Sequence, residues 1–173
     1  PLVLNRIAGR GMLGGKFAGV AGKENMLGIP FIFHEPKKDC VIGISNHEPF
    51  KRIVIPVRRA LYTLYFLHSC HYGINGSLNK YLIHFKEKTI EISLVLGAQI
   101  GNTEGKYSLP WKSDVARIAW HDAKTDACLY LLEWQSPLPD EIIESIEVTA
   151  PVQTAKLFLA GITGYAAFDL IIE

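Results

Sequence analysis

The stretch from Arg52 to Cys70 reads RIVIPVRRALYTLYFLHSC, and it decides the fold class. In its first part, the two-residue period of a strand points Ile53, Ile55 and Val57 to one face, which we expect to be buried, and Arg52, Val54 and Pro56 to the other. Its second part, from Leu61 to Cys70, is almost wholly apolar and is typical of a central strand covered on both faces. Together the two parts predict a sheet that packs against a second layer.

The rest of the chain repeats this pattern of short strands between turn-forming residues. Polar and Gly-rich clusters occur at 73–76, 101–105 and 121–126, and no segment shows a helical stripe over three turns. The stretch Asp140–Ser145 has room for one short helical turn. About ten strands at this spacing indicate an all-β, two-sheet antiparallel sandwich. Besides the two strands above, the expected strands are 29–33, 40–44, 81–85, 89–96, 115–120, 128–134, 142–148, 156–163 and 168–172.

The first 27 residues differ from the rest because they are rich in Gly and carry little strand pattern. We expect residues 1–27 to pack on the surface of a single sandwich domain of residues 28–173, a length that suits one well-cored domain. The chain starts at Pro1 without an initiator methionine, which we interpret as a mature product or a module of a longer protein.

The charge balance argues against two classes of partner. Lys and Arg total 18 and Asp and Glu total 17, so the net charge is +1, and the basic residues are scattered. A nearly neutral chain has no electrostatic attraction to nucleic acid or to an anionic membrane surface. No apolar run reaches the length that a membrane span requires. We therefore expect no nucleic-acid partner and no membrane insertion.

The chain has three cysteines, Cys40, Cys70 and Cys128, and none falls in a Cys-x-x-Cys spacing. A zinc site is therefore not expected. All three lie in apolar, strand-like surroundings, where a thiol acts as a small hydrophobic side chain. We predict that Cys70 and Cys128 are buried and unpaired.

Several strands resemble those of a known module. Residues 64–69, LYFLHS, are similar to a Leu-Tyr-Phe-Leu-His-Thr strand of a β-sandwich module attached to bacterial polysaccharide-degrading enzymes. Gly28–Phe31 resembles the Gly-Val-Pro-Phe strand of that module, and Tyr81–Phe85 resembles its Tyr-x-Ile-His-Tyr strand. The resemblance keeps the same order over most of residues 28–163.

This resemblance implies a galactose-binding-like jelly-roll sandwich that binds an oligo- or polysaccharide. It also implies that the chain serves a neighbouring catalytic domain of the same polypeptide, a glycoside hydrolase or polysaccharide lyase. Such modules act in extracellular, periplasmic or cell-surface locations. One feature departs from the family, which commonly carries an Asp-Trp pair after a Gly-x-x-Ile-Gly turn. Here Gly101 is followed by Asn102-Thr103-Glu104, and a Trp comes only at Trp111. In a ligand site built from this region, the specificity would therefore have changed or been lost.

The candidate ligand-binding residues are aromatic and polar side chains in loops or at strand ends. Sugars stack on aromatic rings while polar groups bind their hydroxyls, and rigid scaffolds display binding groups at loop ends. Trp111 follows Pro110 in a long loop, and its alternative role is that of a packing lid on the end of the sandwich. Trp120, Trp134, Tyr65, Phe66, Tyr81 and Phe85 are interpreted as core residues, and His68 and His84 as buried, hydrogen-bonded histidines. The expected ligand-binding set is Trp111, Tyr107, His71, Tyr72, Asn75 and His121.

No catalytic pattern stands out in the sequence. There is no marked carboxylate pair for glycoside cleavage, and the adjacent Cys70 and His71 point to opposite faces of a strand. A structural calcium ion remains an open expectation, held by backbone carbonyls with either Asp122 and Asp126 or Glu35 and Asp39.

Three functions are weighed on these grounds. The leading hypothesis is a non-catalytic carbohydrate-binding module. The alternative is a structural or interaction domain that braces a neighbouring catalytic domain, which would present an exposed apolar patch. The third is an independent jelly-roll polysaccharide lyase, for which only His71 with Tyr72 gives a hint.

Overall fold

The computed structural model describes residues 2–3, 20, 22–33, 41–46, 51–71, 77–149 and 155–166. Within these residues the chain is all-β, as predicted, and its helical structure is limited to one 3-10 turn, η1 (Gly105–Tyr107). The strands are β1 (Leu2–Val3), β2 (Gly22–Met26), β3 (Ile29–Phe33), β4 (Ile42–Ile44), β5 (Arg52–Ala60), β6 (Thr63–His71), β7 (Ser77–Phe85), β8 (Thr89–Val95), β9 (Ala116–Asp122), β10 (Ala127–Gln135), β11 (Ile142–Thr149) and β12 (Lys156–Tyr165).

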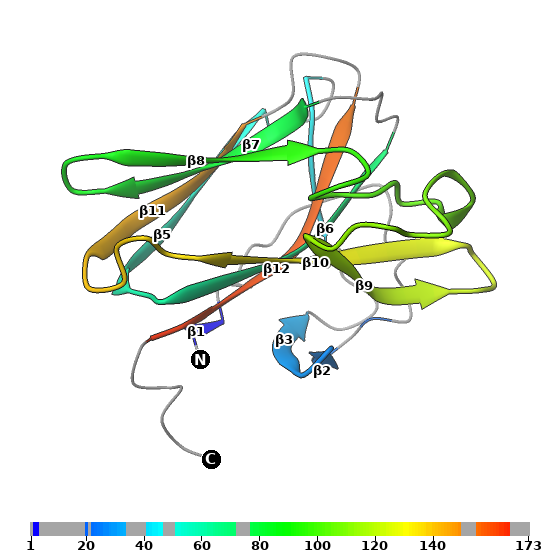
Figure 1. Ribbon diagram of the computed structural model, residues 1–173, viewed down its shortest axis with the longest axis horizontal. Helices are drawn as coiled ribbons and strands as arrows, with labels where there is room; N and C mark the ends of the chain where they lie inside the picture. Colours follow the sequence, from blue (N-terminus) through cyan, green and yellow to red (C-terminus); the bar gives the residue numbers. More distant parts are fainter. Residues whose placement is uncertain are drawn as a thin grey trace.

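These strands form two main sheets that face each other (Figure 1). The six-stranded sheet has the order β1-β12-β6-β10-β9, with β4 also paired to β12. The four-stranded sheet has the order β5-β11-β7-β8. Strands β2 and β3 pair only with each other among the described residues, and all the paired strands are antiparallel. The two-sheet antiparallel arrangement agrees with the prediction.

The two strands that decided the fold class lie where their patterns predict. In β5 Ile55 and Val57 are buried, whereas Val54 and Pro56 are exposed. Strand β6 has β12 on one side and β10 on the other, and nearly all its side chains are buried. It is therefore a central strand covered on both faces, which is why its sequence lacks alternation.

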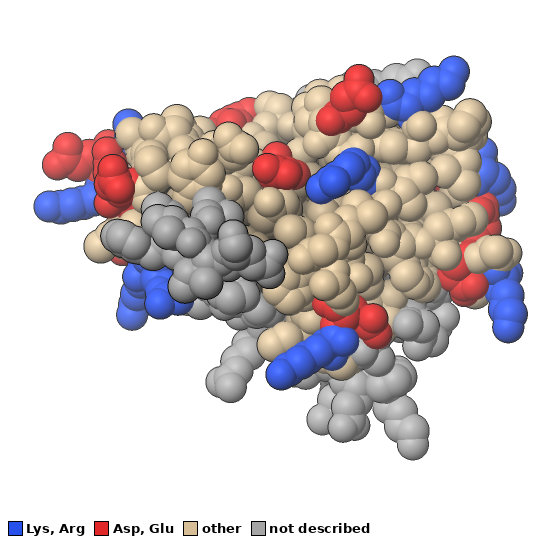
Figure 2. Space-filling view, turned by 60° about the horizontal axis from the view of Figure 1, so that its bottom comes forward, with Lys and Arg blue, Asp and Glu red and all other residues tan. Residues whose placement is uncertain are grey.

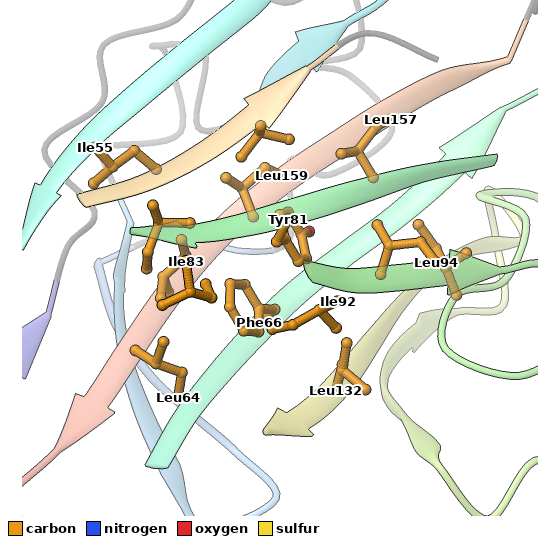
Figure 3. Close-up of a cluster of buried hydrophobic side chains, with 14 of the residues drawn as sticks. Ile55, Leu64, Phe66, Tyr81, Ile83, Ile92, Leu94, Leu132, Leu157 and Leu159 are labelled. Carbon is orange, nitrogen blue, oxygen red and sulfur yellow. The ribbon is translucent and has the colours of Figure 1, made fainter. Parts of the chain in front are cut away.

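The main core fills the space between the two sheets (Figure 3). Phe66 of β6 and Tyr81 of β7 stack there, with ring centroids 4.3 Å apart and an angle of 11° between the rings. Leu64, Ile83 and Leu94 are fully buried around them. Each such apolar side chain contributes about 1.5–3 kcal/mol to the free energy of unfolding, so the facing sheets are held together mainly by this cluster.

The β2–β3 hairpin lies beside the six-stranded sheet (Figure 1). A second apolar cluster joins this hairpin to the outer face of that sheet. Phe31 and Phe33 of β3 are buried against Leu129 and Phe158 of that sheet. The Thr163 hydroxyl of β12 donates a 2.7 Å hydrogen bond to the Pro30 carbonyl and links the hairpin to the sheet. The sandwich thus has one outer face covered by a hairpin.

Strand β2 lies in the segment that was expected to carry little strand pattern. Its sequence, GKENM, is mostly polar and its side chains are mostly exposed, which explains the weak pattern. The hairpin turn forms because Leu27 and Gly28 both adopt positive φ, 57° and 89°, the backbone that two-residue hairpin turns need.

The strand expected at 142–148 is confirmed as β11, and the short helical turn considered within Asp140–Ser145 does not form, because β11 begins at Ile142. Ile143 and Ile146 of this strand are both fully buried although they lie three residues apart. The register of β11 shifts between Ile143 and Ser145, so one extra residue bulges out there. The bulge turns both isoleucines toward the core. The expected strand at 168–172 and Cys40 lie outside the described residues.

Candidate functional site

Residues 101–105, called the inserted segment below, lie between β6 and β10 at one end of the six-stranded sheet. The two strands pair directly only from Thr63 opposite Gln135 to His68 opposite Tyr130. Beyond that point, backbone hydrogen bonds run through the inserted segment instead. They join Cys70 N–H to Gly101 O (2.9 Å), Thr103 N–H to Cys70 O (2.6 Å), Cys128 N–H to Thr103 O (2.7 Å) and Gly105 N–H to Asp126 O (2.8 Å).

Buried polar contacts fix the inserted segment in place. The fully buried Thr103 hydroxyl donates to Cys70 O at 2.8 Å and lies 3.1 Å from the Ser69 hydroxyl. The Tyr130 hydroxyl donates to Asn102 O at 3.1 Å. Burial raises the pKa of the Cys70 thiol to about 12, and it raises the pKa of the Tyr130 hydroxyl well above its usual range. These groups are therefore neutral structural contacts near pH 7.

The inserted segment leads directly into η1, which carries an exposed aromatic ring. The Tyr107 side chain is 67% exposed. The Lys106 ammonium lies 4.8 Å from the centroid of that ring and 3.0 Å from a carboxylate oxygen of Glu104. The hydrogen bond from Lys106 to Glu104 is the main reason why the pKa of Lys106 is raised. A cation–π contact and an ion pair therefore place charged groups beside Tyr107.

The β9–β10 turn binds η1 from the other side. Asp126 accepts a 2.8 Å hydrogen bond from the Lys106 backbone N–H, and its second carboxylate oxygen lies 3.1 Å from His121 Nε2. These contacts, chiefly the Lys106 N–H, hold the pKa of Asp126 below its usual value. Five side chains thus meet at this end of the sandwich, and we call them the end cluster: Glu104, Lys106, Tyr107, His121 and Asp126.

Trp111 is anchored to the sandwich. Its indole N–H donates a 2.7 Å hydrogen bond to Ala116 O. Its ring lies 4.5 Å, centroid to centroid, from the ring of Tyr130 at an angle of 45°, and the side chain packs partly buried against the main core. This is the arrangement of the packing lid that was weighed against a sugar platform, whereas the role of Trp111 in sugar binding stays a prediction.

The other predicted ligand-binding residues have mixed outcomes. His71 ends β6, and the antiparallel pairing of β6 with β10 and of β10 with β9 places it at the same end of the sheet as His121. His71 is partly buried and His121 is exposed. Tyr107 belongs to the end cluster. Tyr72 and Asn75 lie outside the described residues.

The residues predicted to pack in the core do so. Phe66, Tyr81 and Phe85 are buried, and Trp120, Trp134 and Tyr65 are partly buried against the two apolar clusters. His84, predicted as a buried, hydrogen-bonded histidine, is hydrogen-bonded but lies half-buried on the outer face of the four-stranded sheet. Cys70 and Cys128 are buried, and both thiols are free.

His68 is the buried, hydrogen-bonded histidine that the sequence predicts. Its Nε2 lies 2.9 Å from Gln99 O and its Nδ1 lies 2.7 Å from the Tyr81 hydroxyl. Because a carbonyl only accepts, Nε2 carries the proton and Nδ1 accepts from the tyrosine. Burial lowers the pKa of His68 to about 4, so the ring is neutral near pH 7.

The carboxylates proposed for calcium are engaged by protein donors. Asp122 accepts from the Lys124 N–H at 3.0 Å and from the Thr125 hydroxyl at 2.8 Å, and Asp126 is bound as described above. A cation bound by these two carboxylates would have to share them with these donors, and a calcium ion there stays a prediction. Within the described part of the chain, no group of three or more His, Cys, Asp or Glu side chains could hold a metal ion. Glu35 and Asp39 lie outside it.

Glu104 and Lys106 are not among the residues that the sequence singles out. The cluster Gly101–Gly105 has the composition of a loop, yet it pairs with strands far away along the chain. The sequence feature that could have indicated these two residues is a pair of opposite charges beside an aromatic residue, Glu104-Gly105-Lys106-Tyr107.

The surface view adds a finding on charge. On the face in Figure 2, acidic and basic residues are interspersed over a mostly uncharged surface, and the blue atoms form no continuous basic area there.

In the described ranges, no helix is long and apolar enough to cross a membrane. Comparisons of the sequence with models of known protein families and with curated proteins gave no match.

Proposed function

We propose that the chain is a non-catalytic carbohydrate-binding module with a galactose-binding-like jelly roll, which targets a polysaccharide-degrading enzyme to its glycan outside the cytoplasm. Three things support this proposal: the ordered strand resemblance, the all-β antiparallel sandwich and the end cluster.

The observation that carries the proposal is the exposed ring of Tyr107 among fixed polar groups. A sugar buries its apolar C–H face on an aromatic ring while its hydroxyls need donors and acceptors around the rim. Tyr107 offers a ring that is 67% exposed, and Lys106 lies against it. His121 and Asp126 are held by hydrogen bonds at the adjacent turn.

The contacts support a proposal in which the two aromatic residues of this loop have different tasks. Tyr107 is the platform, because little of its surface is used within the chain. Trp111 is the support, because its N–H and part of its ring are already used by Ala116 and Tyr130. A support of this kind keeps the loop ordered before binding, which lowers the entropic cost of binding a sugar.

The test is binding of the intact chain to a panel of neutral and uronate-containing polysaccharides, by affinity gel electrophoresis and then calorimetry. We expect Tyr107→Ala to weaken binding about tenfold, the worth of roughly 1.4 kcal/mol of lost ring contact. Its melting temperature should stay that of the unmodified chain. The matched control is Tyr62→Ala, because Tyr62 lies between β5 and β6 at the opposite end of the sandwich. Equal loss in both variants would reject the end cluster as the site.

One observation favours the bracing alternative. Val54 of β5 and Ile142 of β11 are 47% and 52% exposed on neighbouring strands of the four-stranded sheet. Val54 pairs with Glu147, five residues along β11 from Ile142, so the two side chains offer a neighbouring catalytic domain two separate apolar contacts. If the unmodified chain binds no glycan in the panel, and a Val54→Ser/Ile142→Ser variant of the full polypeptide loses stability of its catalytic domain, the bracing function replaces the proposed one.

A further inference from the structure

The register of β6 and β10 would pair the two buried cysteines, Cys70 and Cys128, if the two strands continued side by side. The last direct pair of the two strands is His68 opposite Tyr130. Two residues further on, continued pairing would place Cys70 directly opposite Cys128. The inserted segment prevents this, because Cys70 bonds to Gly101 and Thr103, and Cys128 bonds to Thr103.

The distance between the two cysteines is therefore set by the inserted segment. With one extended segment between them, their Cα atoms are two strand spacings apart, roughly 10 Å. A disulfide requires a Cα separation below about 7 Å. If β6 and β10 paired directly, Cys70 and Cys128 would lie about 5.5 Å apart, within the range of a disulfide.

The backbone of both cysteines is already oriented for direct pairing. Cys70 directs its N–H and C=O toward the inserted segment, and Cys128 directs its N–H toward it from the other side. If the segment left, these groups would face each other as a hydrogen-bonded pair of an antiparallel ladder. The hydrogen bonds of this direct β6–β10 ladder would replace part of the backbone hydrogen bonds that are lost when the segment leaves. Both side chains are buried, Cys70 in the main core.

We propose that the inserted segment holds apart a latent disulfide pair, Cys70 and Cys128, and that oxidation by a small-molecule disulfide traps a second conformation in which the segment is displaced. The oxidation is a thiol–disulfide exchange. One cysteine thiolate attacks the small disulfide, forms a mixed disulfide and releases one small thiol. The second cysteine attacks the mixed disulfide and releases the other thiol, so two protein thiols are oxidised and one small disulfide is reduced.

Exchange requires the segment to open first. Both thiols are buried, and a buried thiol of raised pKa is a poor nucleophile. The displaced segment carries Glu104 and leads into Lys106 and Tyr107, so the oxidised form loses the end cluster. This inference holds whether or not that cluster binds sugar, because it rests only on the pairing of β6, β10 and the inserted segment.

The experiment uses the intact chain incubated with oxidised glutathione in urea below the unfolding transition. Free thiols are then alkylated, and disulfides are mapped by mass spectrometry. We expect a Cys70–Cys128 disulfide and faster tryptic cleavage after Lys106 in the oxidised form than in the reduced form. A Cys128→Ser variant treated in the same way should keep the slow cleavage. Glutathione adducts without the Cys70–Cys128 link, or a linked form with unchanged cleavage after Lys106, would overturn the proposal.

A matched pair of variants separates local opening from global unfolding. Thr103→Val removes a buried hydroxyl bond of the inserted segment, and Thr163→Val removes a buried hydroxyl bond of the hairpin with little change of shape. Both threonines are fully buried. We expect Thr103→Val to speed disulfide formation roughly tenfold, as losing a bond worth about 1.4 kcal/mol would do, and Thr163→Val to leave the rate nearly unchanged. Equal acceleration in both variants would show that oxidation follows global unfolding and would reject the switch.

Discussion

The Arg52 guanidinium donates two hydrogen bonds of 2.7 Å to the Glu147 carboxylate, one from Nε and one from a terminal nitrogen. His84 adds a 3.1 Å contact to the same carboxylate and a 2.9 Å contact to Thr89. The four residues come from β5, β11, β7 and β8, so a single polar row crosses every strand of the four-stranded sheet. Two parallel bonds to one carboxylate fix geometry better than a single contact between flexible side chains.

We predict that Glu147→Gln lowers the melting temperature at pH 7. The hydrogen bond from Arg52 is the main cause that lowers the pKa of Glu147 in the folded chain. A group whose pKa is lowered by folding adds stability above its unfolded pKa of 4.5, and this stability is lost as the pH falls through the folded pKa. The loss in the variant should therefore shrink as the pH falls below 4.5.

The control for this prediction is Glu91→Gln. Glu91 pairs with Lys80 on the same sheet, but both side chains of that pair are nearly half exposed. Exposed ion pairs add little to stability. Thermal melts of the two variants from pH 3 to pH 7 should show the larger effect for Glu147→Gln, and an equal effect would mean that the polar row does not stabilise the sheet.

His68 should make the fold sensitive to acid in a defined range. Burial lowers its pKa from 6.5 to about 4. Folding therefore opposes protonation, so the contribution of His68 is complete above pH 6.5, falls as the pH drops, and levels off below about pH 4. The full change corresponds to about 3 kcal/mol. Urea unfolding at pH 7 and pH 4.5 measures it, and His68→Gln should remove most of the difference between the two values.

A strand could be predicted from the sequence where one of its faces lies on the core, because its buried and exposed residues then alternate. Tyr81–Phe85 alternates cleanly because β7 lies between β11 and β8 with one face on the core. Strand β2 could not be predicted, because its polar residues are ordered by β3 and the turn at Gly28. The bulge of β11 between Ile143 and Ser145 could not be predicted either, because a bulge depends on neighbouring strands that the local sequence does not reveal.

The candidate site was predicted in part. Tyr107 and His121 were singled out because aromatic and polar residues in loops bind ligands, and the structure brings them to the same end of the sheet. The inserted segment could not be foreseen. Its hydrogen-bonding partner Cys70 lies 31 residues from Gly101, and a loop composition gives no sign of pairing at that separation.

Trp111 should contribute to stability. Its ring packs on Tyr130 and its N–H is bonded to Ala116 O. Trp111→Ala removes a partly buried aromatic side chain and should cost about 2 kcal/mol, somewhat less than a fully buried one. Trp111→Phe keeps much of the packing and should cost about 1 kcal/mol, the worth of the hydrogen bond. Chemical unfolding measures the loss of stability in both variants and should show the larger loss for Trp111→Ala. Equal stability of Trp111→Ala and the unmodified chain would contradict the packing role.

Thiol titration should show that Cys70 and Cys128 are protected from labelling in the native chain. Cys70 and Cys128 are buried, and burial raises the pKa of both thiols. Since the thiolate is the reactive form, neither should react within minutes with an aromatic disulfide reagent at pH 8 in the native chain. Both should react at once in denaturant. Peptide mapping of the labelled sites identifies which thiol reacted, and rapid native labelling at either position would contradict the structure.

Gly101 should be the least replaceable glycine of the inserted segment. A Cβ atom added there would clash with Cζ of Tyr130, whose buried ring is held by Trp111 and by its own hydrogen bond to Asn102. Either the ring or the segment must move, and overpacking of this kind costs about 1–3 kcal/mol. We therefore expect Gly101→Ala to lower stability by about 2 kcal/mol.

The matched control is Gly43→Ala in β4. There the added Cβ would meet Cε of Lys156 at 2.6 Å, and the end of a flexible lysine side chain can turn away. The cost of that change should stay below about 0.5 kcal/mol. Chemical unfolding gives both values, and proteolysis after Lys106 reports whether the segment has moved. A small cost for Gly101→Ala with unchanged proteolysis would mean that the contact of Gly101 with Tyr130 does not hold the inserted segment. A large cost with faster proteolysis is the result expected if that contact positions the end cluster.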